Sequence, residues 1–103
     1  MKHLNSWTSF NESLSSQNKI LTEIINKIGE DKLSDVVFGN SLTPYVYFIF
    51  NNIPFSISLT DKVGIDGDYS TISVIVEVDG ITESLGYFSI NEVDNVVSTI
   101  LKY

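Results

Sequence analysis

The chain of 103 residues contains no cysteine, and it also lacks arginine and alanine. The absence of cysteine excludes disulfides and thiolate chemistry and favours a reducing cytoplasm as the compartment. The absence of arginine removes the planar fork that binds phosphate or carboxylate through two parallel hydrogen bonds. The protein therefore cannot form disulfides, use a thiolate, or bind an anion through a guanidinium group.

Positive charge is scarce, because six lysines accompany thirteen carboxylates and the formal net charge is −7. Direct binding to nucleic acid needs a basic footprint, so we expect none. The acidity is concentrated between Asp61 and Asp94, where Lys62 is the one lysine among eight carboxylates: Asp61, Asp66, Asp68, Glu77, Asp79, Glu83, Glu92 and Asp94. Such an imbalance indicates either a surface that meets a basic protein partner or a solvated rim.

Patterns typical of catalysis are missing as well. The one histidine, His3, lies near the beginning of the chain without an expected partner, and no serine lies in a Gly-x-Ser-x-Gly turn. Paired carboxylates could hydrolyse glycosides, but a domain of this size offers little room for a cleft. Asp61, Asp66 and Asp68 crowd one loop, yet their spacing is not that of a calcium-binding EF-hand. We therefore predict that the protein is not an enzyme and that it holds no cofactor or metal.

The chain has one long uncharged run, from Val36 to Thr60, but it is unsuited to crossing a membrane. A spanning helix needs about 20 predominantly apolar residues, and here Pro44, Asn51, Asn52 and Pro54 interrupt the run. The N-terminus lacks the apolar region of a signal peptide. An apolar content of 43% is enough for one core. We expect a single domain, residues 1–103, without contact to a membrane.

Apolar residues at helical spacing predict a helix toward each end of the chain. The first begins near Phe10, at a capping box formed by residues 9–12, and ends at Gly29. Its apolar stripe comprises Trp7, Phe10, Leu14, Leu21, Ile24 and Ile28. A short helical turn is expected from Asp31 to Phe38. The last helix begins at a second capping box, Ser89 to Glu92, and its stripe comprises Ile90, Val93, Val96, Val97, Ile100 and Leu101.

Alternating residues predict two hairpins between these helices. The first turns at Asn51-Asn52, since asparagine tolerates positive φ, and pairs Phe48 with Phe55. The second turns at Asp79-Gly80 and pairs Leu85 and Tyr87 with Val74 and Ile72. Glu83 falls opposite Val76 in this register and interrupts its apolar face.

These elements predict an α+β fold in two layers: an N-terminal helix, a four-stranded antiparallel meander of two hairpins, and a C-terminal helix. Helices on one face leave the other face of the sheet bare. Tyr45, Tyr47, Ile49 and Ile75 would occupy that bare face. Because tyrosine is enriched in protein interfaces, we expect an interface there, either in a homodimer or with a different protein.

The opening residues, from Met1-Lys2-His3 through Phe10-Asn11-Glu12-Ser13, resemble the beginning of many small proteins of large tailed phages. Those proteins often begin with Met-Lys, then an aromatic residue, then Phe-Asn-Glu or Phe-x-x-Glu. The resemblance covers about 13 residues, and Trp7 stands where phenylalanine is usual. It implies origin in a phage or mobile element, and hence a location in the host cytoplasm or in the virion.

With that origin, the profile is similar to phage-encoded inhibitors of host defence such as anti-CRISPR proteins, which are commonly small, acidic and non-catalytic. We expect a protein that inhibits a host nucleic-acid-binding or defence protein as a partial nucleic-acid mimic. The partner-binding carboxylates would be Asp61, Asp66, Asp68, Glu77, Asp79 and Glu83. One alternative is a virion or assembly protein that associates through the aromatic sheet face. Another is a secretion-type chaperone, which shares the acidity and the size.

Overall fold

The computed structural model describes residues 19–40, 43–62 and 69–103. The helical elements of these ranges are α2 (Lys19–Ile28), the 3₁₀ turn η2 (Glu30–Lys32) and α3 (Val93–Leu101). The strands are β1 (Leu33–Asn40), β2 (Pro44–Phe50), β3 (Ile53–Lys62), β4 (Tyr69–Val78) and β5 (Ile81–Ser89). The predicted α+β class is confirmed.

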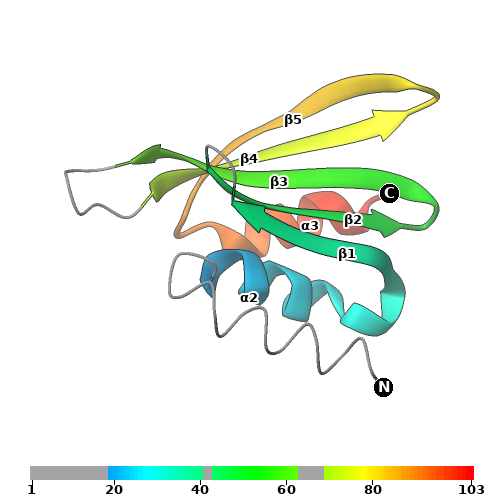
Figure 1. Cartoon of the computed structure of the whole chain (residues 1–103), viewed down its shortest axis with the longest axis horizontal. Helices are drawn as coiled ribbons and strands as arrows, with labels where there is room; N and C mark the ends of the chain where they lie inside the picture. The colour runs from blue at the N-terminus through cyan, green and yellow to red at the C-terminus, as the bar shows by residue number, and fades with distance from the viewer. Residues whose placement is uncertain (1–18, 41–42, 63–68) are drawn as a thin grey trace.

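All five strands form one antiparallel sheet in chain order, and both helices lie on one side of it (Figure 1). We call the face toward the helices the inner face and the opposite one the outer face. The core lies between helices and inner face, and its strand residues are Phe38, Val46, Phe48, Phe50, Phe55, Ile57, Leu59, Ile72, Val74 and Val76. The helices contribute Leu21, Ile24, Ile25, Ile28, Val93, Val96, Val97 and Ile100.

The β2–β3 hairpin has the register expected from its alternation. Phe48 pairs with Phe55, and Phe50 pairs with Ile53 next to the turn. The turn residues Asn51 and Asn52 adopt φ of 53° and 65°, the left-handed region that asparagine tolerates. The rings of Phe48 and Phe55 stack with centroids 5.4 Å apart at the centre of the core. The prediction for this hairpin is confirmed.

The helical turn predicted from Asp31 to Phe38 is wrong. Only Asp31 and Lys32 are helical, as part of η2, and residues 33–38 belong to β1, a strand that the prediction of four strands did not include. The register of β1 against β2 shifts between Ser34 and Val37, so β1 carries one extra residue, and Asp35 adopts a φ of 53°. Because of this bulge, Val36 is half-buried and Phe38 is buried. The half-buried residues Leu33 and Val36 are therefore three positions apart, an interval that is also typical of a helix.

The expected register of the β4–β5 hairpin is correct at its tip and wrong beyond it. Val78 pairs with Ile81, and Val76 pairs with Glu83, as predicted. A register shift between Val74 and Ile75 then inserts one extra residue into β5, where Gly86 has a φ of 122°. As a result Tyr87 pairs with Ser73, not with Ile72, and so turns to the outer face.

The predicted end of the first helix is confirmed, whereas the last helix starts later than its capping box predicts. The backbone N–H of Gly29 donates to the carbonyl of Ile25 at 3.0 Å and closes α2. The N-cap of α3 is Glu92, which makes no side-chain capping bond. Ahead of α3, the N–H of Ser89 donates to Glu92 Oε1 at 2.9 Å, and Ser89 Oγ accepts from the N–H of Asn91 at 3.2 Å instead of from that of Glu92. The expected part of the first helix before residue 19 lies outside the described residues.

An ion pair joins the two helices at the surface. Lys27 Nζ donates to Asp94 Oδ1 at 3.0 Å and lies 4.0 Å from Glu23 Oε2. The hydrogen bond and the charge of Asp94 raise the pKa of Lys27 above its ordinary value. A raised pKa in the folded state means that the pair stabilises the protein below the ordinary lysine pKa, and that this contribution is lost as pH rises through the folded-state value.

Asp94→Asn should therefore lower stability at neutral pH, and its difference from the wild type should shrink to nothing above the raised pKa of Lys27. Urea titrations at pH 7 and at a pH about one unit above the ordinary lysine value of about 10.4 measure this. Glu83→Gln on the edge strand β5 is the control for general charge effects. A difference that stays constant over this range would contradict the assignment.

Phe48→Ala should destabilise the domain by about 3–5 kcal/mol, because Phe48 is fully buried and its removal opens a cavity beside Phe55. Thr82→Ala, at an exposed position of β5, should change stability by less than about 0.5 kcal/mol. Urea denaturation of both variants measures the two effects. Equal losses would place the centre of the core elsewhere.

Candidate functional site

The outer face is the part of the sheet that neither described helix covers. Strand pairing arranges its centre in two rows that cross the sheet, which we call the central rows. The first row runs from β1 to β5 through Gly39, Tyr45, Ser58, Ser73 and Tyr87. The second row runs from β1 to β4 through Val37, Tyr47, Ser56 and Ile75. Ile49 follows Tyr47 on the same side of β2, two residues nearer the turn.

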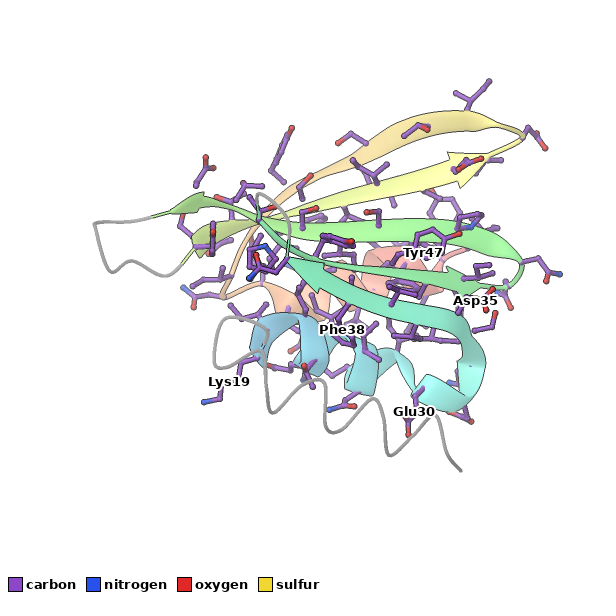
Figure 2. The ribbon with its side chains drawn as sticks, in the orientation of Figure 1. Lys19, Glu30, Asp35, Phe38 and Tyr47 are labelled. Carbon is purple, nitrogen blue, oxygen red and sulfur yellow. The ribbon has the colours of Figure 1, made fainter. Side chains whose placement is uncertain are left out.

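These rows combine large and small side chains in a definite order. Tyr45 and Tyr47 stand on β2, short serines occupy the middle of the sheet on β3 and β4, and Tyr87 stands on β5. Figure 2 shows Tyr47 on the side of the sheet opposite Phe38, which lies between β1 and α2. The face therefore presents tyrosines on both flanks of a strip of hydroxyl groups.

Gly39 fits Tyr45 into this face. A Cβ built at Gly39 would overlap the ring and hydroxyl of Tyr45, so the ring lies directly over the glycine. Gly39 has no side chain to lift this ring, and its pairing with Tyr45 brings the two together. The Tyr45 ring therefore extends over β1 and occupies the space that a side chain at position 39 would fill.

The central rows carry no charged side chain although the chain has a net charge of −7. They do expose apolar and aromatic surface: Val37 is 51% exposed, Tyr47 37% and Tyr87 73%. Ser73 in the middle is 9% exposed. The central rows are thus a neutral, partly aromatic part of the surface of an acidic protein.

All four residues expected in the sheet interface, Tyr45, Tyr47, Ile49 and Ile75, lie on the outer face. Sequence reasoning missed Tyr87, which it placed on the inner face opposite Ile72. Gly86 is the signal that could have found it, because an isolated glycine within a strand often marks a bulge. The interface role of these residues stays a prediction.

The expected acidic site is more dispersed. Glu77 pairs with Thr82 and lies on the outer side of the β4–β5 hairpin, Glu83 pairs with Val76 on the inner side, and Asp79 lies in the turn. Asp61 lies at the far end of the sheet, where its carbonyl accepts a hydrogen bond from Ser70 Oγ at 2.8 Å. The ten residues of β4 separate these ends by about 30 Å. Asp66 and Asp68 lie outside the described residues.

The remaining site chemistry is sparse in the described part of the chain. Residues 19–40, 43–62 and 69–103 contain no group of three or more histidine, cysteine or acidic side chains that could hold a metal ion. His3 lies outside these ranges. No helix within them has the length and apolar content that a membrane crossing requires.

Comparison of the chain with protein-family models, with curated proteins and with solved structures finds no match.

Gly39→Ala should force the Tyr45 ring off β1 and lower stability by about 1–3 kcal/mol, the usual range for an inserted methyl group without space. In a Tyr45→Ala background the same change should cost much less, because the ring is gone. Urea denaturation of the wild type, both single variants and the double variant gives the coupling energy. Additive effects would show that the ring does not rest on Gly39.

Proposed function

We propose that this protein is a non-catalytic binding protein that associates with a protein partner through the outer face of its sheet. The observation that carries the proposal is the contrast between an acidic chain and two central rows without charge. Tyr45, Tyr47 and Tyr87 supply large side chains with a polar tip, the residue type enriched in interfaces. The serines between them supply donors and acceptors without bulk.

The nature of the face selects the kind of partner. A neutral aromatic face gains free energy by burial, and it offers no cation to a phosphate or carboxylate. The negative charge of the rest of the protein repels nucleic acid and membranes of anionic lipid. The partner that fits this face is therefore a protein whose own contact surface is nearly uncharged.

The nucleic-acid mimic expected from the sequence receives less support. A mimic needs carboxylates arranged on one surface, as phosphates are. Glu77 and Glu83 instead lie on opposite sides of the β4–β5 hairpin, and Asp61 lies on β3 at the far end of the sheet. The inhibitory role and the phage origin rest on the resemblance of residues 1–13, outside the described residues, and stay predictions. The proposed binding role corresponds to the alternative of an assembly protein.

Photo-crosslinking in the native cell tests the proposal. A photoreactive phenylalanine derivative in place of Tyr47 should yield a covalent adduct with a protein, because Tyr47 lies in the second central row and is exposed. The same residue in place of Asn26, exposed on α2, is the matched control and should yield none. Adducts are detected by mass after denaturing electrophoresis.

Adducts at position 47 alone would support the outer face as the binding surface, whatever the mass of the partner. Adducts only at position 26, or at neither position, would overturn the proposal.

A further inference from the structure

We infer that the partner is a second copy of this chain, with the two outer faces packed against each other about a two-fold axis parallel to β3. This inference rests on the proposed function and names its partner. Two-fold dimers use the same patch on both subunits, so the patch must complement itself in charge, shape and size. Each requirement can be examined on the outer face.

Charge restricts where two copies can meet. Each copy has a net charge of −7, so any contact between acidic surfaces is repulsive. The central rows bring no carboxylate to the contact, and charges at the perimeter are screened over about 10 Å at 0.1 M salt. Glu77 lies on the same side of β4 as Ile75, two residues nearer the hairpin turn, and so at the perimeter of a contact that covers the whole face. Two copies can therefore bring their central rows together at low electrostatic cost.

The two outer faces are complementary in shape when the two-fold axis runs along β3. Rotation about this axis places β2 over β4 of the other copy and β1 over β5. Tyr87 then meets the Tyr45 ring of the partner subunit, which lies over the partner's Gly39. The two rings pack against each other, and the contact occurs twice by symmetry.

The centre of the contact would consist of Ser56 and Ser58, which lie on the axis and face their own copies. Serine is short, so two such strands can approach closely, and each hydroxyl can both donate and accept a hydrogen bond. A two-fold axis parallel to β3 makes the two β3 strands parallel to each other, which is within the range of about 30° that aligned packing of two sheets allows. The serine strip is therefore as compatible with self-association as the tyrosines.

Size is also adequate. Five strands about 4.8 Å apart, with about eight residues at about 3.3 Å each, give a face of about 24 by 26 Å, or about 600 Å² in projection. A surface of side chains exceeds its projection, which brings each face close to the roughly 800 Å² per partner of a standard stable interface.

Light scattering on the purified full chain tests the inference. The wild type at micromolar concentration should have twice the 11.5 kDa mass of one chain. Tyr87→Asp buries a charge in the proposed contact and should raise the dimer Kd at least about tenfold. Ile81→Asp is the matched control: Ile81 lies on the same strand with 67% exposure against 73%, but pairs with Val78 on the inner side. It should remain dimeric, and circular dichroism verifies the fold of both variants.

A single-cysteine variant tests the position of the axis. The chain has no cysteine, so Ser58→Cys carries one unique thiol. A short bis-maleimide should couple two copies through position 58, and should not couple copies of Asn26→Cys, the control on α2. Coupling at 58 alone supports the axis along β3.

A monomeric wild type, or a dimer that persists unchanged in Tyr87→Asp, would overturn the inference. The outcome at position 47 in the cell then separates the two proposals. An adduct with a different protein leaves the binding role standing without the dimer, whereas absence of any adduct removes both.

Discussion

The register of the β2–β3 hairpin is the constraint on which the rest of the structure depends. Phe48 stacks on Phe55 at 5.4 Å, and this pairing assigns every residue of both strands to a face. Because successive side chains of a strand point to opposite faces, a slip of one residue would bury the tyrosines and expose the phenylalanines. The same pairing that assembles the core therefore also assembles the outer face, and loss of one implies loss of the other.

This dependence explains what the sequence could and could not predict. The β2–β3 hairpin, the end of α2 at Gly29 and the placement of Tyr45, Tyr47, Ile49 and Ile75 on the outer face followed from strict alternation and from turn and capping residues, which act locally. β1 and the register of β5 did not follow, because each contains an extra residue at a bulge. The bulge at Asp35 gives Leu33 and Val36 a spacing that is typical of a helix. The bulge at Gly86 places Tyr87 on the outer face, whereas regular alternation predicts the inner face. Bulges break the period on which pattern reasoning relies.

The distribution of charge gives the two faces of the sheet different roles. Lys27 and Asp94 join the helices on the inner side, and the carboxylates of β5 and its turn lie around the hairpin, while the central rows stay neutral. A net charge of −7 repels other acidic surfaces, and the central rows bring no carboxylate of their own. On the proposed function, this acidity would make the neutral surface selective for an uncharged partner.

The two bulges also restrict how the sheet can associate. β1 and β5 are the edge strands, and an open edge can pair with another sheet through its unpaired backbone groups. A bulge disrupts the regular ladder that such pairing needs, and here each edge strand has one. Edge-to-edge growth is thereby disfavoured at both edges of the described sheet, which is consistent with the proposed association through its outer face. On β5 the same extra residue adds Tyr87 to that face, so one irregularity both blunts the edge and completes the first central row.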